Sequence, residues 1–163
     1  MSVDLGALLE SFRQSAFRLE TLAHYTVPQE VEWFAEWRRT GKLPELTPDN
    51  DSWLRMVRNH CAAGKRMQRV RVVSSPLTDY ERFELALFPP SVAAGEEIRV
   101  VQRSAVVRTA DFWLFDESRA VLLRYDETGR FQGVEDGIAS TCCQHRDRVL
   151  AQSIPLEEYL ATL

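Results

Sequence analysis

Six basic side chains fall between residues 55 and 71 with no acidic residue among them: Arg55, Arg58, Lys65, Arg66, Arg69 and Arg71. In a chain whose formal net charge is −4, this local excess of positive charge is suited to contact with a phosphate or another anion. The stretch lacks the interleaved aromatic side chains that stack on bases. A structural role is therefore favoured, with the arginines paired to the nearby acids Asp79, Glu81 and Glu84.

Cys142, Cys143 and His145 are the next group able to do chemistry. A structural zinc site needs four ligands, and no Cys-x-x-Cys pair or second histidine lies within motif distance, so no metal site is predicted. Neither cysteine begins a recognisable nucleophile motif. Ile138, Cys142, His145 and Val149 recur at helical spacing, which favours burial of the thiols in the core.

Two aspartates bracket the apolar run Phe112 to Phe115, and paired carboxylates at strand ends can bind a metal or transfer protons. Aspartates at strand ends more commonly form turns, so Asp111 and Asp116 are interpreted first as turn residues. Within the apolar run, Trp113 is placed to line a pocket.

Length and composition limit the possibilities further. With 163 residues and 45% hydrophobic content, the chain is long enough to form one globular domain without disulfides or metals. The mildly acidic balance argues against a nucleic-acid binder that uses its whole surface. No run of about 18 apolar residues occurs, and the N-terminus carries Asp4 and Glu10 without a basic region, so a soluble, cytoplasmic protein with reduced cysteines is predicted.

Residues 66 to 88 indicate a strand, a turn and a helix. Val70, Val72 and Val73 alternate with arginines, as in a strand with one buried face. Pro76 suits the first turn of a helix, and the spacing of Thr78 and Glu81 matches a capping box. Apolar residues then recur at helical spacing, at Tyr80, Phe83, Leu87 and Phe88. Arg82, between two of them, is predicted to form a structural ion pair.

The remaining patterns predict a mixture of helices and strands. Helices are expected over residues 4–15, with Asp4 as the cap, over 28–40 and 52–63, over 137–152, and from Pro155 onward. Residues 16–27 are expected to be extended, 42–51 to form a loop, and Pro89 and Pro90 to break the chain. Strands are expected at 97–103 and 111–116, followed by a hairpin of 120–125 and 131–135 whose turn uses Gly129.

Four stretches resemble an uncharacterised actinobacterial domain family: Gly64 to Leu85, Ala93 to Arg99, Asp111 to Asp116, and Tyr125 to Phe131. The likeness extends from Phe12 to Tyr159. Members are typically encoded near helix-turn-helix regulators, which implies such a regulator or another protein as a partner. The resemblance implies no particular chemistry.

More remotely, the order of helix, Gly64, basic strand, hairpin and closing helix is similar to one half of a phospholipase D-like fold, including its non-catalytic sensor versions. The catalytic signature of that superfamily is a His-x-Lys pair followed by an aspartate. Here His24 is followed by Tyr25 and Thr26, His60 by Cys61 and Ala62, and His145 by Arg146 and Asp147. The resemblance therefore implies the fold without the phosphodiesterase chemistry.

Together these observations predict a single α/β (or α+β) domain spanning 1–163. Residues 1–51 are expected to form a helical segment and loop, and residues 52–163 a body with a mixed, four- to five-stranded sheet. No cofactor, metal or catalytic residue is predicted. Candidates for binding a ligand or anion are Arg66, Arg69, Arg71, Tyr80, Arg82, Glu84 and Trp113.

The predicted function is that of a non-enzymatic, cytoplasmic regulatory or accessory protein that binds a partner protein or a small ligand. The alternative is a divergent phosphoryl- or nucleic-acid-processing enzyme, or a nucleic-acid-binding protein. It would use the basic cluster of residues 55–71 together with Asp111, Asp116 or Glu84.

Overall fold

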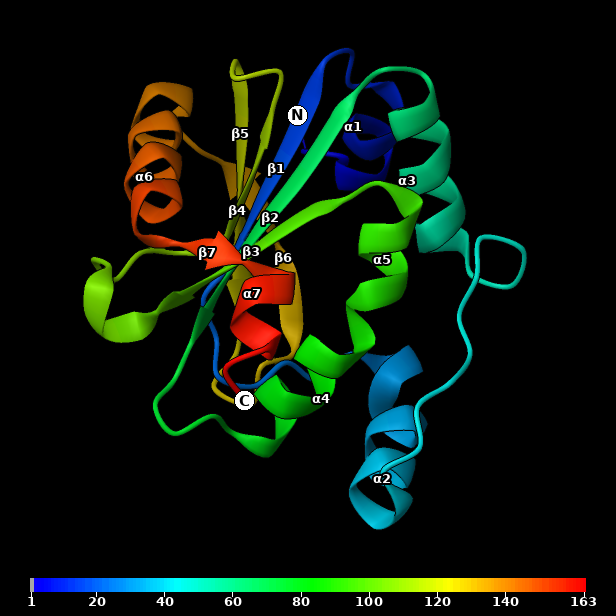
Figure 1. The fold of residues 1–163 in the computed structure, drawn as a ribbon. Helices are drawn as coiled ribbons and strands as arrows, with labels where there is room; N and C mark the ends of the chain where they lie inside the picture. Colours follow the sequence, from blue (N-terminus) through cyan, green and yellow to red (C-terminus); the bar gives the residue numbers. More distant parts are fainter. Residues whose placement is uncertain (1) are drawn as a thin grey trace.

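A seven-stranded mixed sheet runs through the centre of the computed structural model, which describes residues 2–163 (Figure 1). Its strands lie in the order β6-β5-β4-β1-β2-β3-β7. Strands β1, β2 and β3 are parallel, and the other neighbouring pairs are antiparallel. The bounds are β1 Ser15–Glu20, β2 Arg66–Val73, β3 Glu97–Gln102, β4 Phe112–Phe115, β5 Arg119–Tyr125, β6 Phe131–Asp136 and β7 Ile154–Pro155.

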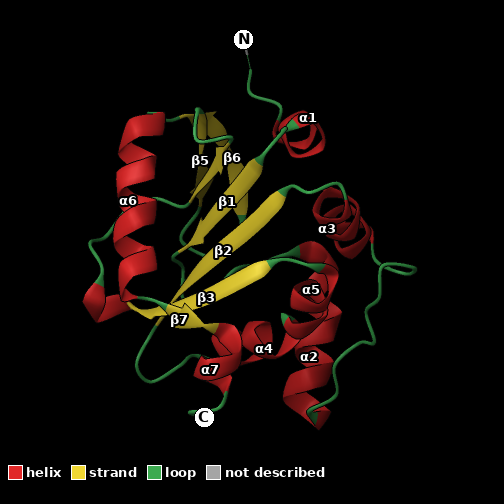
Figure 2. Ribbon diagram, turned by 45° about the horizontal axis from the view of Figure 1, so that its top comes forward, coloured by secondary structure: helices red, strands yellow, loops and turns green. Residues whose placement is uncertain are grey.

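Helices cover both faces of the sheet (Figure 2). One face is covered by α6 (Ala139–Gln152). The opposite face carries α1 (Leu5–Ser11), α3 (Ser52–Ala62), α4 (Asp79–Leu87), α5 (Pro89–Ala94) and the short α7 (Leu156–Leu160), and α2 (Val31–Thr40) packs against α4. Two 3-10 turns, Pro28–Glu30 and Arg103–Ala105, precede α2 and follow β3. In the described chain no helix is both long and apolar enough to cross a membrane.

The two faces of the sheet differ in chemistry. Phe17 and Leu19 of β1 pack with Val70 and Val72 of β2 beneath α6, in an apolar layer. Burial of each such side chain stabilises the fold by about 1.5–3 kcal/mol. Side chains at the alternate positions of the same strands point to the opposite face. There the sequence places arginines and a glutamate, which form the buried ionic network described below.

Local signals in the sequence explain the start of α4. The Thr78 side chain accepts a hydrogen bond from the Glu81 amide, and the Glu81 carboxylate accepts one from the Thr78 amide, which confirms the predicted capping box. Pro76 lies in the loop before the helix, and its predicted place in the first turn is wrong because Thr78 is the cap. Pro89, predicted to break the chain, is the first residue of α5, where a missing N–H costs nothing.

The α/β class is confirmed, but the sheet has more strands than the predicted four to five. The two-residue β7, which pairs with Arg99 and Val100, is too short to give a periodic signal. Residues 15–20 form β1 between β2 and β4, so a division into a helical segment 1–51 and a sheet-containing body 52–163 is wrong. The pattern showed an extended segment but not its non-local partners.

Candidate functional site

A cavity of about 360 Å³ lies on the polar face of the sheet and is here called the aromatic cavity. Its volume is within the range of small-molecule sites. Eight aromatic side chains from strands, helices and loops line it: Tyr25, Trp33, Trp53, Tyr80, Phe88, Trp113, Tyr125 and Phe131. Aromatic walls of this kind bury a flat organic group well and leave a few polar groups to orient it.

Tyr25 is held in this cavity by the β5–β6 hairpin. The Thr26 amide donates to the Gly129 carbonyl at 2.9 Å, and the Thr26 hydroxyl donates to the Thr128 carbonyl at 2.8 Å. Gly129 has φ +80°, and a Cβ there would lie 2.3 Å from the His24 carbonyl oxygen. The glycine predicted for the turn thus also permits the close approach that fixes the segment after β1.

Charged groups in the lining are mostly acidic. Four carboxylates, Glu20, Glu30, Asp51 and Glu84, face two guanidinium groups, Arg18 and Arg69. Asp51 is the cap of α3, where its side chain accepts from the Leu54 amide. Apart from Glu30, the remaining charges belong to a buried ionic network.

Arg69 uses its guanidinium donors inside the network. Its Nε and Nη2 donate to the two oxygens of Glu96 at 2.9 and 3.1 Å, and its Nη1 donates to Glu20 at 2.9 Å. The guanidinium also lies over the rings of Trp53 and Phe88, 5.5 and 4.9 Å from their centroids. Burial opposes ionisation of Glu20, but Arg69 and Arg18 outweigh it and lower the pKa of Glu20 to about 2.

Arg71 lies behind the cavity and is 0% exposed. Its Nε donates to the Glu84 carboxylate and its Nη1 donates to the Val72 carbonyl, while Nη2 is without a hydrogen-bond partner in residues 2–163. Burial raises the pKa of Glu84 to about 8 although Arg71 opposes the shift, and Glu20 and Glu30 add to the rise. Glu84 therefore holds its proton more readily than an exposed glutamate does.

The half-buried Glu30 of the cavity lining is bonded to a tyrosine rather than to an arginine. Its carboxylate accepts a hydrogen bond from the Tyr80 hydroxyl at 2.8 Å. Within residues 2–163 no arginine, lysine or histidine forms an ion pair with it. Burial raises the pKa of Glu30 above its ordinary value. The cavity thus contains a carboxylate whose charge is not balanced by a neighbouring cation.

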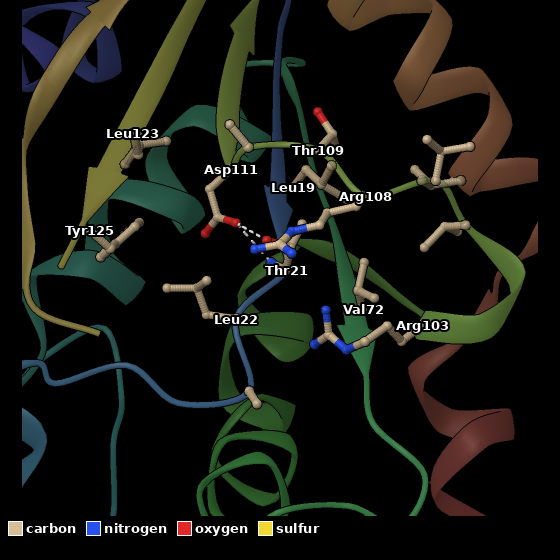
Figure 3. A pocket seen from close by; sticks show the side chains of 15 residues that line it. Leu19, Thr21, Leu22, Val72, Arg103, Arg108, Thr109, Asp111, Leu123 and Tyr125 are labelled. Atoms are coloured by element: carbon tan, nitrogen blue, oxygen red, sulfur yellow. Dashed lines mark hydrogen bonds between the residues drawn. The ribbon is translucent and has the colours of Figure 1, made fainter. Parts of the chain in front are cut away.

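A second cavity, of about 710 Å³, adjoins the carboxyl ends of the parallel strands and is here called the arginine cavity. Such edges are where open α/β sheets bind ligands. Arg103 and Arg108 line it, are exposed, and form no ion pair in the described part of the chain. Figure 3 shows both side chains extending toward the segment after β1 that carries Thr21.

Asp111 separates the two cavities. It is 3% exposed, lines the arginine cavity, and accepts a hydrogen bond from the Thr21 amide at 2.9 Å (Figure 3). It also accepts hydrogen bonds from Arg18 at 3.2 Å. The Tyr25 hydroxyl also donates to it. Arg18 and Tyr25 line the aromatic cavity, whereas Asp111 and Thr21 line the arginine cavity. The Asp111 carboxylate therefore bonds to residues of both cavities and forms part of the wall between them.

The seven side chains predicted as binding candidates divide into three groups. Arg69, Tyr80, Glu84 and Trp113 all line the aromatic cavity. Arg71 lies behind it and is bonded to Glu84. Arg66 and Arg82 are exposed and line neither cavity, and Arg66 pairs with Glu97 on the surface at 2.7 Å.

The basic cluster of residues 55–71 does not form one surface. Arg69 and Arg71 are inside the protein, whereas Arg55 is exposed and donates to the carbonyls of Pro48 and Asp49. Of the three predicted acidic partners only Glu84 is correct. Glu81 caps its own helix, and Asp79 pairs with Arg38 at 3.7 Å. Arg69 pairs instead with Glu20, the last residue of β1, and with Glu96, which lies between α5 and β3.

Cys142 is buried in the apolar layer under α6, as its helical stripe predicted, and burial raises the pKa of its thiol. The prediction that Ile138 lies on the same buried stripe is wrong, because Ile138 precedes α6 and is 69% exposed. Asp116 is a turn residue as interpreted, accepting three backbone amides of residues 13–15. Residues 2–163 contain no cluster of three or more His, Cys, Asp or Glu side chains that could hold a metal ion.

Sequence reasoning missed Arg18, Glu20, Tyr25 and Glu30 as site residues. One signal for the first two was present, because charged residues alternate with Phe17 and Leu19 in a strand that the sheet buries. Glu30 carried no such signal, since an acid in the first turn of a helix has an ordinary electrostatic explanation.

The fold has a known counterpart. The crystal structure of a phospholipase D family member, Nuc from Salmonella typhimurium, superposes with a TM-score of 0.55 at 9% identity, covering 91% of this chain and 86% of that chain. The protein therefore has a phospholipase D-like fold, and the remote resemblance noted in the sequence is confirmed at that level.

The sequence also matches, over residues 3–161, the model of a family described as a domain of unknown function, DUF6879. The chain belongs to this family, which confirms membership of an uncharacterised domain family. No curated protein matches the sequence.

Proposed function

We propose that this protein is a non-enzymatic small-ligand-binding protein whose site is the aromatic cavity. The observation that carries the proposal is the convergence of aromatic walls with buried charged groups in one cavity of ligand size. Arg69, Tyr80, Glu84 and Trp113 come from three separate elements and meet there.

The buried ionic network supports this proposal energetically. Buried ion pairs contribute little net stability compared with well-packed apolar side chains of similar volume, because removing charges from water is costly. The fold alone therefore does not require Arg18, Glu20 and Arg69 on this face of the sheet. A binding site does need polar groups whose orientation is fixed before the ligand arrives, and the network provides that.

The sequence supports binding without phosphodiesterase chemistry, because none of the three histidines is followed two positions later by lysine. A helix-turn-helix partner, a regulatory role and a cytoplasmic location stay predictions from the sequence.

Filling the aromatic cavity tests the proposal. Leu46 lines the cavity from the loop 41–51, and Leu46→Trp is expected to raise the Kd of cavity-binding fragments at least about tenfold, since the indole occupies their space. Leu43→Trp is the matched control, because Leu43 is in the same loop but packs outside the cavity. A fragment library of amines, alcohols and acids is screened by amide chemical shifts, expected to change over residues 25–30. Absence of hits there, or equal loss in both variants, contradicts the proposal.

A second candidate function, anion binding, is favoured by the two unpaired arginines of the arginine cavity. These residues replace the sequence-predicted cluster as the basis for contact with a phosphoryl group. Arg108→Gln is expected to raise the Kd for pyrophosphate about tenfold, because a charged hydrogen bond is lost. Arg130→Gln, exposed and outside both cavities, serves as the control in isothermal titration. Unchanged affinity in Arg108→Gln would remove this candidate.

A further inference from the structure

We infer that the ligand of the aromatic cavity is an organic cation, with an ammonium or guanidinium group beside Glu30 and an aromatic or flat apolar body against the walls. The inference rests on the proposed function and names the chemical class of its ligand. Three independent features of the cavity lead to it: the cations of the lining are already engaged, the Glu30 carboxylate has neither an ion-pair partner nor a helix-capping role within residues 2–163, and the walls attract positive charge.

The two arginines of the lining have partners for their donors. Arg69 is bonded through all three of its guanidinium nitrogens to Glu20 and Glu96. Arg18 is bonded to Asp111 through both terminal nitrogens, and one of these also donates to the Tyr125 hydroxyl at 3.0 Å. An anionic ligand would have to displace buried carboxylates to reach them, so the site does not favour a negative charge.

Glu30 provides the missing half of an ion pair. Its only side-chain hydrogen bond in the described chain is the one from Tyr80, which leaves acceptor capacity on the carboxylate. It lies at the lining of the cavity and is partly buried, so an ion pair formed there is less screened than one on the open surface. A ligand cation would balance the charge of this carboxylate.

The aromatic side chains add a second attraction for a cation. Three arginines of the network already lie over aromatic rings, Arg18 over Trp113, Arg69 over Trp53 and Phe88, and Arg71 over Tyr25, at 4.9–6.0 Å from the ring centroids. Trp33 lines the same cavity as Glu30, is half-buried, and has no guanidinium over its ring among residues 2–163. The Trp33 ring is available to a ligand cation.

Three probes of one shape and different charge test the inference: benzylamine, benzyl alcohol and benzoate, which at pH 7 are a cation, a neutral molecule and an anion. Benzylammonium is expected to bind the full-length protein with a Kd at least about tenfold below those of the other two. Binding is followed by amide chemical shifts of residues 25–30 and by tryptophan fluorescence.

Glu30→Gln is expected to remove most of this preference, because the amide keeps the hydrogen bond from Tyr80 but not the charge. Glu32→Gln is the matched control: it removes the same charge from the exposed side of α2, outside the cavity, and is expected to leave the preference unchanged. Trp33→Leu tests the contribution of the aromatic walls. It is expected to weaken the binding of benzylammonium more than the binding of benzyl alcohol, because only the cation is attracted by the face of the indole ring.

The outcomes separate this inference from the proposed function. If benzyl alcohol or benzoate binds as tightly as benzylammonium, or if Glu30→Gln and Glu32→Gln have equal effects, the cavity binds ligands but the cation assignment is wrong. If none of the three probes perturbs residues 25–30, and the fragment library also fails there, the proposed function is wrong as well.

Discussion

Arg71→Met is expected to lower the free energy of unfolding by about 3–5 kcal/mol at pH 9, above the folded-state pKa of Glu84, because it leaves the Glu84 carboxylate buried without its partner. Methionine preserves most of the apolar stem, so the loss reports the ion pair rather than a cavity. The control is on the same strand: Arg66 also pairs with a glutamate, but at the surface, and Arg66→Met is expected to cost below about 1 kcal/mol. Urea unfolding of both variants measures the difference.

This loss should depend on pH in a defined direction. The folded-state pKa of Glu84, about 8, is above its ordinary value of 4.5, so between these values the native state holds a proton that the unfolded state has released. Stability attributable to Glu84 therefore decreases as the pH rises through this window. Without Arg71 the charged form is still less favourable, so the cost of Arg71→Met is expected to be smaller at pH 5 than at pH 9.

Equal losses for Arg71→Met and Arg66→Met, or a pH-independent loss in the former, would show that the buried pair does not behave as an ion pair. The Arg71→Met, Glu84→Gln double variant completes the cycle. If the pair is coupled, it loses less than the sum of the single variants, since removing both charges leaves no unpaired ion.

Local chemistry accounts for what the sequence predicted well. The capping box of Thr78 and Glu81, the glycine end of α2 and the hairpin turn at Gly129 each depend on residues within a few positions of one another. Tyr80 and Trp113 were also predicted as pocket residues, and both line the aromatic cavity. Helical spacing predicts that Tyr80 lies on the buried face of its helix, and the short apolar run predicts that Trp113 lies in a buried strand.

Non-local pairing accounts for what the sequence did not show. The arginines of β2 alternate with valines, a pattern equally consistent with a half-exposed strand. Their burial follows from β1, which supplies Glu20, and from Glu96 and Glu84, which lie 27 and 13 positions from Arg69 and Arg71. The position of β1 between β2 and β4 likewise depends on register with strands about 50 and 100 residues away.

The ionic network also explains why the site was only partly predicted. A buried charged residue is recognised in a sequence through its partner. Arg18 and Tyr25 share one partner, Asp111, which lies some 90 positions further along the chain. Asp111 was interpreted as a turn residue on general grounds, and its equivalent at the other end of β4, Asp116, does have that role. Only the packed sheet distinguishes the two aspartates.

Asp111→Asn is therefore expected to cost about 3 kcal/mol or more in the free energy of unfolding, because Arg18 loses its buried counter-ion. Asp116→Asn is the matched control and is expected to cost about 1 kcal/mol, since the amide oxygen can still accept from backbone N–H groups and asparagine tolerates the positive φ at this position. Chemical denaturation of both variants gives the comparison.

Because Asp111 also holds Tyr25 at the partition between the cavities, Asp111→Asn is expected to weaken benzylammonium binding, whereas Asp116→Asn leaves it unchanged. A stability loss without a binding loss would mean that the partition supports the fold but not the aromatic cavity. Equal stability losses in the two variants would contradict the distinction between the two aspartates, because removing a buried counter-ion leaves a charge unpaired, whereas removing the charge of the half-buried turn residue Asp116 does not.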